Sequence, residues 1–219
     1  LREWRPLVEQ GYAPAQFNLG LMYYNGWGVP QDYAEAAKWW RLSAAQGTAE
    51  AQNSLGVVYQ NGEGVPQDDV QAAKWFRLAA EQGNALAQTN LGYFYLNGQG
   101  VPRDYVQAHM WGNLAAAQGQ TIGAANRDIA AKQMTPAQIE QAQYLARSWR
   151  PAAAPRPSGV DTSLGRKRVA RLQRDLAAIG YNPGPADGVM DAKTRAAIRT
   201  FEQRAGLPVT GRLCQTKFG

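Results

Sequence analysis

The stretch Gly28-Val29-Pro30-Gln31-Asp32-Tyr33-Ala34-Glu35-Ala36-Ala37-Lys38-Trp39-Trp40 decides the fold. A closely similar stretch begins at Gly64 and a third begins at Gly100, each 36 residues after the one before. A fixed period of this length is typical of arrays in which one small structural unit is stacked on the next. The sequence therefore predicts at least three copies of one unit.

Each copy reads as a loop that leads into a helix. Pro30 is tolerated just ahead of a helix but not inside one. Asp32 is a favourable N-cap, and Glu35 three residues later completes a capping-box pattern. The later copies keep the pattern as Asp68 with Gln71 and Asp104 with Gln107.

The predicted helix carries an apolar face made by Ala36, Trp39 and Leu42, which fall at helical spacing. The Trp recurs as Trp75 and Trp111, and this identical spacing favours packing in the core over an aromatic ligand platform. Gln46 and Gly47 are expected to end the helix, since Gly readily adopts the left-handed C-cap conformation.

An earlier helix is predicted from about residue 13 to 24, closed by Asn25-Gly26. Gly20 lies inside it and recurs as Gly56 and Gly92, although Gly in a helix costs about 1 kcal/mol relative to Ala. Its retention predicts that two helices cross closely at this position. Between residues 11 and 26, nine positions are identical in all three copies, and in the first copy they are Gly11, Ala13, Ala15, Gln16, Leu19, Gly20, Tyr23, Asn25 and Gly26.

The combined pattern A-x-A-Q-x-x-L-G-x-x-Y-x-x-G-x-G-V-P-x-D-x-x-x-A-x-x-W resembles the Sel-one-like repeat (SLR) family, which is related to tetratricopeptide repeats. The resemblance implies an all-α fold, in which antiparallel helix pairs stack into a right-handed α/α superhelical solenoid that serves as a protein-interaction scaffold. The repeats are placed at 11–46, 47–82 and 83–118.

Caps are expected at both ends of the solenoid, which is assigned to residues 1–149. Residues 1–10 match the end of a repeat's second helix, while residues 119–149 depart from the pattern. Thr135 and Pro136 predict the start of a last helix that runs to about Trp149. The chain opens inside an expected helix and shows no signal peptide, so we interpret it as a trimmed or processed form.

The positions that vary between copies predict the surface that meets a partner. They follow one stripe of the first helix, at spacings of three, seven and ten residues. Residues that build the fold should repeat, whereas residues shaped for a partner should not; drift at unconstrained surface positions is an equal alternative. The predicted contact residues are Phe17, Leu21, Tyr24, Asn53, Val57, Gln60, Thr89, Tyr93 and Leu96, and the stripe also includes Pro14, Glu50 and Leu86.

The remainder divides into a Pro-rich linker at 150–164 and a small unit at 165–219. The small unit has Gly180-Tyr181, Asp187-Gly188 and Gly206-Leu207-Pro208-Val209-Thr210-Gly211 around two predicted helices. It resembles the three-helix peptidoglycan-binding-like domain, which implies attachment to the cell wall. The apolar positions expected inside are Val169, Leu172, Leu176, Ile179, Ile198 and Phe201.

A peptidoglycan site is predicted where the loop from Gly180 to Gly188 meets the start of the second helix. Such a ligand offers amides, carboxylates and sugar rings, which need hydrogen-bonding groups, an apolar wall and positive charge. A helix N-terminus also favours a carboxylate. Asp187 is interpreted mainly as a turn former. The candidate contacts are Tyr181, Asp187, Thr194, Arg195 and, as a weaker candidate, Gln173.

Composition excludes several classes of site. The only Cys is Cys214 and the only His is His109, so an internal disulfide, a Cys-based zinc site and a multi-histidine metal site are impossible. We expect no cofactor and no metal, and we interpret His109 as an exposed or hydrogen-bonded histidine. No apolar run reaches the roughly 18 residues that span a bilayer.

The positive charge is concentrated in the C-terminal part. Residues 1–149 hold 10 Lys/Arg and 12 Asp/Glu, whereas residues 150–219 hold 13 and 5. Nucleic-acid binding is therefore an alternative on charge alone, although no aromatic residues interleave with the basic ones for base stacking. The basic cluster comprises Arg166, Lys167, Arg168, Arg171 and Arg174.

The sequence thus favours a non-enzymatic scaffold in the periplasm or cell envelope, which binds an unidentified protein and is tethered to peptidoglycan. One alternative is the targeting or regulatory part of a cell-wall hydrolase whose catalytic domain lies outside this chain. The localisation follows from the family resemblance alone.

Overall fold

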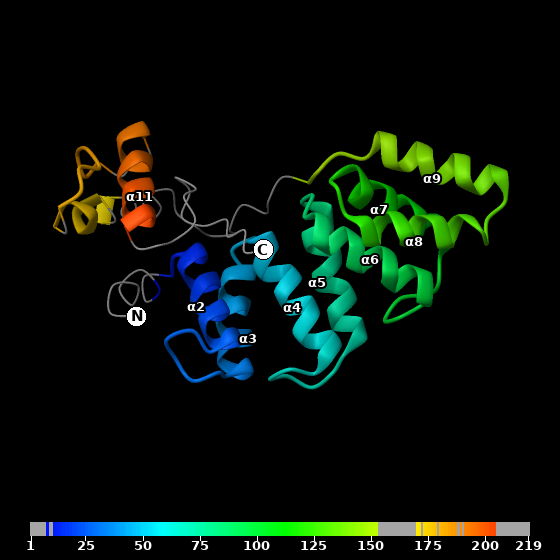
Figure 1. The fold of residues 1–219 in the computed structure, drawn as a ribbon, viewed down its shortest axis with the longest axis horizontal. Helices are drawn as coiled ribbons and strands as arrows, with labels where there is room; N and C mark the ends of the chain where they lie inside the picture. Colours follow the sequence, from blue (N-terminus) through cyan, green and yellow to red (C-terminus); the bar gives the residue numbers. More distant parts are fainter. Residues whose placement is uncertain are drawn as a thin grey trace.

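The computed structural model describes residue 8 and residues 11–152, 170–171, 173–178, 180–187, 189 and 191–204 (Figure 1). Within these residues the regular structure is helical, with no strand. No helix in this part of the chain combines the length and the apolar character needed to cross a bilayer.

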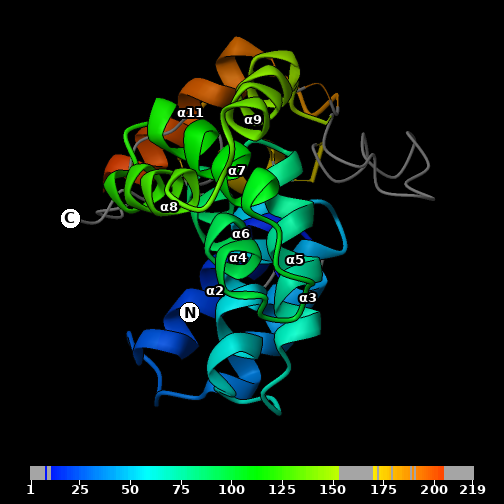
Figure 2. The same ribbon diagram turned by 90° about the vertical axis from the view of Figure 1, so that its right-hand side faces the viewer.

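Residues 13–117 form three helix pairs, each built from a first and a second helix (Figures 1 and 2). The prediction of a first helix near 13–24 closed by Asn25-Gly26 is confirmed, because Gly26 takes the left-handed conformation directly after it. The pairs are α2 (Ala13–Asn25) with α3 (Tyr33–Ala44), α4 (Ala49–Asn61) with α5 (Asp69–Glu81), and α6 (Ala85–Asn97) with α7 (Tyr105–Ala117).

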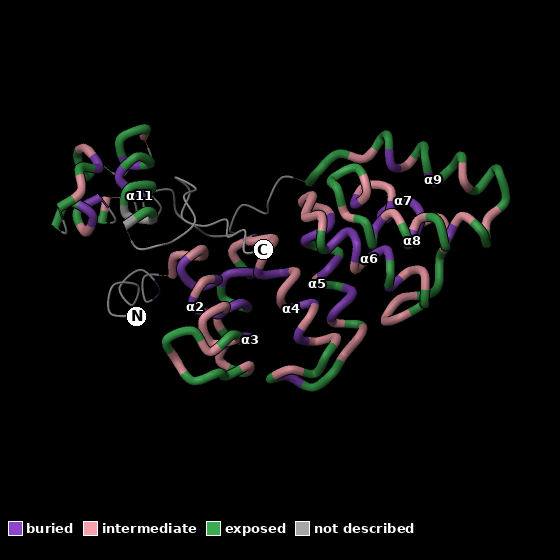
Figure 3. The backbone as a smooth tube through the Cα atoms, viewed as in Figure 1, coloured by how far each residue is buried: buried purple, intermediate pink, exposed green. Residues whose placement is uncertain are grey.

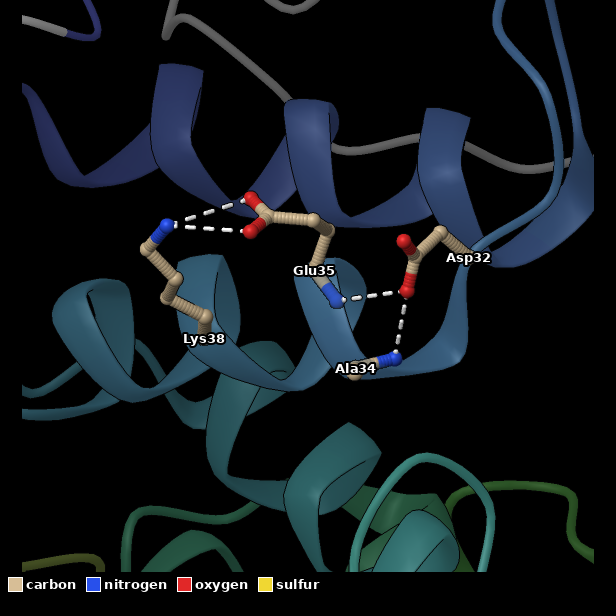
Figure 4. A network of polar contacts seen from close by, with 4 residues as sticks. All are labelled: Asp32, Ala34, Glu35 and Lys38. Atoms are coloured by element: carbon tan, nitrogen blue, oxygen red, sulfur yellow. Dashed lines mark hydrogen bonds and ion pairs between the residues drawn. The ribbon is translucent and has the colours of Figure 1, made fainter.

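The predicted N-caps are confirmed, but none of the three predicted capping boxes is formed (Figure 4). Oδ1 of Asp32 accepts hydrogen bonds from the backbone amides of Ala34 at 2.9 Å and Glu35 at 3.0 Å. The Glu35 carboxylate does not return to the cap; it pairs with Lys38 Nζ at 3.0 Å. The box cannot close because the Asp32 amide already donates to the Tyr23 carbonyl at 2.9 Å, and the amides of the other two caps donate to the equivalent tyrosines.

In the first two pairs the fully buried aromatic side chain lies one residue beyond the predicted Trp, whereas in the third pair the predicted Trp111 is itself buried. Trp40 and Phe76 are fully buried, while Trp39 and Trp75 are only half-buried. Leu42, which was predicted to lie on the apolar face, is exposed. Alternating burial along the helices is visible in Figure 3. In these two pairs the apolar face is therefore shifted by one residue from the prediction, so that Trp40 and Phe76 contact the first helix of their own pair.

The predicted close crossing at the helix glycines is confirmed. A Cβ atom on Gly20 would overlap the indole of Trp40, and one on Gly56 would overlap the ring of Phe76. In the third pair the position of Trp40 and Phe76 is taken by Gly112, and a Cβ on Gly92 would find its nearest neighbours at 3.4 Å. In the third pair, the backbone of one helix therefore lies next to the backbone of the other, with no large ring between them.

A buried glutamine links each pair internally and to the pair before it. Nε2 of Gln82 donates to Oε1 of Gln52 at 2.7 Å, and Nε2 of Gln52 donates to the Ala44 carbonyl of the preceding pair at 3.2 Å. The same arrangement recurs for Gln118, Gln88 and the Ala80 carbonyl. Because the amides are buried, each would be costly to leave without a partner.

The array ends in α8 (Thr121–Ala131) and α9 (Pro136–Ser148). α9 begins at the predicted Thr135 cap, where Thr135 and Gln138 form a full capping box. The main packing partner of α9 is α7, not α8, and the Trp149 ring lies 6.3 Å from that of Trp111. The last helix therefore turns back along the array, as Figure 1 shows.

The C-terminal unit is described in part. Residues 173–178 are helical, Gly180 has a φ of 89° as expected for a helix stop, and α11 spans Ala192–Arg204. Leu176, Ala197 and Ile198 form its small core, with Tyr181 packed at the edge. Other predictions lie outside the described residues or side chains: the third helix, most of the linker, Val169, Leu172, Ile179, Phe201 and Cys214.

Candidate binding surfaces

The predicted stripe on the first helices is partly used in stacking the repeats. Phe17 was expected to be exposed, but it is only 9% exposed and lies in the core shared with α4. Thr89 is also buried, and its hydroxyl donates to the Ala85 carbonyl. These two positions face the first helix of the following repeat. They differ between copies because each of these helix-to-helix interfaces is packed differently.

Three more members of the stripe are engaged within the array. Asn53 accepts a hydrogen bond from Asn90 Nδ2 at 3.1 Å, which joins α4 to α6. Leu21 and Val57 are half-buried against the cores next to them.

Tyr24 also connects two repeats. Its hydroxyl donates to Glu63 at 2.9 Å, and its ring lies 5.3 Å from that of Trp40. Burial, together with the Glu63 carboxylate, raises the pKa of Tyr24 to about 12. Tyr24 therefore joins the first repeat to the second. Its hydroxyl and ring are engaged within the array and are not free to contact a partner.

The exposed apolar part of the stripe lies on α6. Leu86 is 55% exposed and Tyr93 is 42% exposed, one on each side of the buried Thr89. Gln60 and Leu96, which also belong to the stripe, are half-buried. We call Leu86 and Tyr93 the α6 patch.

The sequence reasoning missed the two most exposed equivalents of this patch. Ile122 is 66% exposed and Ile129 is 49% exposed, and they lie 36 residues after Leu86 and Tyr93. The signal was present in the period, but residues 119–149 had been separated from the repeats because Arg127 and Asp128 break the Leu-Gly pattern.

In the C-terminal unit, two candidate site residues are buried in the loop-to-helix junction. Nε2 of Gln173 donates to Oγ1 of Thr194 at 2.9 Å and to the Val189 carbonyl at 2.9 Å. The Thr194 hydroxyl in turn lies 3.0 Å from the Pro183 carbonyl. Both side chains are almost fully buried, so they hold the loop on α11 and do not face solvent.

Asp187 and Asp191 shape the same junction. Oδ1 of Asp187 accepts from the Val189 amide at 2.9 Å and lies 3.2 Å from Gln173 Nε2. Oδ1 of Asp191 accepts from the Thr194 amide at 2.7 Å, and this hydrogen bond is the main cause that lowers the pKa of Asp191. The loop is therefore built by short side chains bonded to nearby backbone, as in other turns.

The exposed groups of this unit are mainly basic. Arg195 lies in the first turn of α11 and is exposed, while Tyr181 is half-buried against the small core. Four other basic side chains are exposed on the same unit: Arg171, Arg174, Lys193 and Arg199. An anionic ligand would meet Arg195 and its neighbours before it met any other predicted contact residue.

His109 does not lie on the surface, in contrast to the expectation. It is 4% exposed, and within the described part of the chain its Nδ1 has no hydrogen-bond partner. Burial is the main cause that lowers its pKa, and the Arg127 guanidinium lowers it further. The equivalent positions of the first two pairs hold Ala37 and Ala73, so the third pair buries an imidazole where the others bury a methyl group.

The described residues contain no cluster of three or more His, Cys, Asp or Glu side chains able to hold a metal ion. Several of their carboxylates are engaged singly in caps, turns and surface pairs, such as Glu35 with Lys38.

Comparison with known proteins agrees with this architecture. The Sel1 repeat family matches residues 13–48, 49–84 and 85–120. A second family, described as "Putative peptidoglycan binding domain", matches residues 165–213. No curated protein is significantly similar to the chain.

Two solved structures resemble the chain. One is a Sel1 repeat protein from Oxalobacter formigenes, which is 37% identical with a TM-score of 0.54 over 58% of this chain and 96% of that one. The other is a protective antigen present in uropathogenic Escherichia coli strains, which displays an SLR fold. It is 30% identical with a TM-score of 0.53, and the match covers 96% of this chain but 45% of the antigen.

Proposed function

Because the chain belongs to the Sel1 repeat family and also carries a peptidoglycan-binding-like domain, we propose that it is a non-enzymatic scaffold of the cell envelope. Its solenoid binds a protein partner, and its C-terminal unit attaches it to peptidoglycan. The observation that carries this proposal is the joining of a helical repeat array to a separate, basic wall-binding-like unit in one chain.

The α6 patch is the proposed centre of the partner surface. Leu86 and Tyr93 are large, apolar and exposed. They belong to the stripe of positions that differ from one repeat to the next. Exposed apolar groups of this kind, and Tyr in particular, are enriched where proteins dock. Gln60 and Leu96 would contribute to the rim, whereas Phe17, Tyr24 and Thr89 support the array.

The partner surface can be tested by site-specific photo-crosslinking in cells that contain an envelope. A benzoylphenylalanine at position 93 should capture one defined protein, and the same amino acid at exposed position 70 on α5 is the matched control. The substitution Leu86→Ser should reduce capture at position 93. Equal capture at positions 93 and 70 would contradict the assignment of the patch.

The proposed wall contact uses the positive charge at the start of α11. Stem peptides of peptidoglycan present free carboxylates, and a guanidinium at a helix N-terminus binds such groups through charge and paired hydrogen bonds. Arg195 is the main contact, with Tyr181 as an apolar wall; Asp187, Gln173 and Thr194 hold the loop in place.

Sedimentation with purified sacculi tests this contact in the full chain. The unmodified chain should pellet with sacculi at low salt, and Arg195→Glu should remain largely in solution. The control is Arg147→Glu, which changes an equally exposed arginine on α9. If the unmodified chain stays in the supernatant, wall attachment is wrong.

The two alternative functions predict other results, which separate assays with sacculi and with nucleic acid would detect. Release of muropeptides from sacculi by this chain alone would support a hydrolase. A steep salt dependence of DNA or RNA binding, with loss on Arg195→Glu, would support the nucleic-acid alternative. The nucleic-acid outcome is not expected, since aromatic side chains do not alternate with the exposed basic residues of the described C-terminal unit.

A further inference from the structure

In α8, which takes the place of a first helix in the array, the centre of the apolar stripe is exposed, whereas it is covered in the helices before it. Ile122, Ala125 and Ile129 follow one another at spacings of three and four residues, and all three are exposed. We call them the α8 stripe. Figure 2 looks toward the end of the array at which α7, α8 and α9 lie.

The central position of the stripe shows why this face differs. The equivalents of Ala125 are Phe17, Asn53 and Thr89, which are buried or hydrogen-bonded by the helix that follows. Asn126 of α8, for example, donates to the Thr89 carbonyl of α6. No helix in the described chain follows α8 in this way, because α9 packs mainly on α7. The α8 stripe is thus the continuation of the interface that joins each first helix to the next.

We propose that a second copy of this chain covers the α8 stripe, through an antiparallel α8–α8 contact about a twofold axis. The stripe reads large, small, large, with Ala125 near its middle. An antiparallel copy therefore brings Ile122 of each chain opposite Ile129 of the other, and the two Ala125 residues allow the helices to approach closely. A surface that is complementary to itself forms a closed dimer, the commonest oligomer.

Charge favours this occupant as well. The stripe contains no charged residue, and the neighbouring Arg127 and Asp128 already pair with each other at 2.8 Å. Two copies therefore meet without facing like charges. A single pair of eleven-residue helices is at the small end of protein interfaces, so the dimer forms weakly and depends on concentration.

Sedimentation equilibrium of the full chain tests the proposal. We expect reversible dimerisation as the concentration rises to about 1 mM, the range in which small interfaces assemble. Ile122→Asp and Ile129→Asp should each leave the chain monomeric, whereas the control Val70→Asp, on an exposed apolar position of α5, should not. A chain that is monomeric throughout overturns the proposal, as does a dimer that both α8 variants retain. Loss of dimerisation would leave the partner surface and the wall contact of the proposed function untouched.

Cysteine crosslinking tests the geometry. In a Cys214→Ser background, Ala125→Cys should form a disulfide-linked dimer on mild oxidation, because the two positions lie near the axis. Gln133→Cys, an exposed control just beyond α8, should not. Crosslinking at 133 without crosslinking at 125 would overturn the antiparallel arrangement even if a dimer exists.

Discussion

The close crossing at Gly56 makes a sharp prediction about stability. In Gly56→Ala the added methyl group would overlap three atoms of the Phe76 ring, which is fully buried. In Gly92→Ala the same methyl group would find its nearest atoms at 3.4 Å, in ordinary contact. The two substitutions are chemically identical and occupy the same position of the repeat.

The expected effects have opposite signs. Overpacking of a core costs about 1–3 kcal/mol, while replacing Gly by Ala inside a helix gains about 1 kcal/mol. With three ring atoms overlapped, we expect the upper part of the overpacking range at Gly56, and hence a net loss of about 2 kcal/mol. At Gly92 only the helix gain remains, so the chain should become more stable by up to about 1 kcal/mol.

Urea unfolding followed by circular dichroism measures both variants. Gly56→Ala should lower the transition midpoint and Gly92→Ala should maintain or raise it, with the slope unchanged. The double variant Gly56→Ala, Phe76→Leu should regain part of the loss, because the smaller side chain leaves room for the methyl group. Similar losses in both single variants would refute the reasoning, since helix crossing would then be equally close in the two pairs.

Three further predictions concern other parts of the chain. His109 has a lowered pKa in the fold, so the unfolded chain binds a proton more readily and stability should fall as the pH drops below about 6.5; His109→Ala should weaken this dependence in melting curves from pH 7.5 to 5. Thr194→Val should destabilise the C-terminal unit by about 1–3 kcal/mol, because Gln173 loses a buried acceptor, and limited proteolysis should detect it, with Thr200→Val as the exposed control. A chain truncated after residue 152 should keep its helical circular dichroism and melting temperature, since the repeats and α9 lie within it; loss of cooperative melting would contradict a self-sufficient solenoid.

The parts of the fold that depend on local sequence could be predicted well. The repeat period, the capping residues and the glycines decide where each helix begins and ends. Asp32 and Thr135 cap the starts of their helices as predicted, and Gly26 ends α2. The all-helical repeat array and its family follow from these signals, and both are shown by the comparisons. Helix phase was harder, because Trp39 and Trp40 are adjacent and only packing against Gly20 decides which one is buried.

The candidate surfaces could be predicted less completely. Variation between copies marked the correct stripe but could not separate positions that meet the next repeat, such as Phe17, from positions that meet solvent, such as Tyr93. In the C-terminal unit, Thr194 and Arg195 are neighbours in sequence, yet one is buried in a hydrogen-bond network and the other is exposed. That difference depends on which side of α11 the loop covers, and a single sequence does not encode it in any local pattern.

The glutamine links have a consequence for how such an array changes in length over evolution. Each Gln donates to a carbonyl in the preceding pair and accepts from a Gln in its own pair, so every internal repeat finds the same neighbours on both sides. A tandem duplication of 36 residues would reproduce all of these bonds, whereas duplication of only part of a repeat would leave a buried amide without a partner. Arrays of this kind can therefore lengthen or shorten by whole repeats at little cost, which adjusts the reach of the scaffold without redesigning its core.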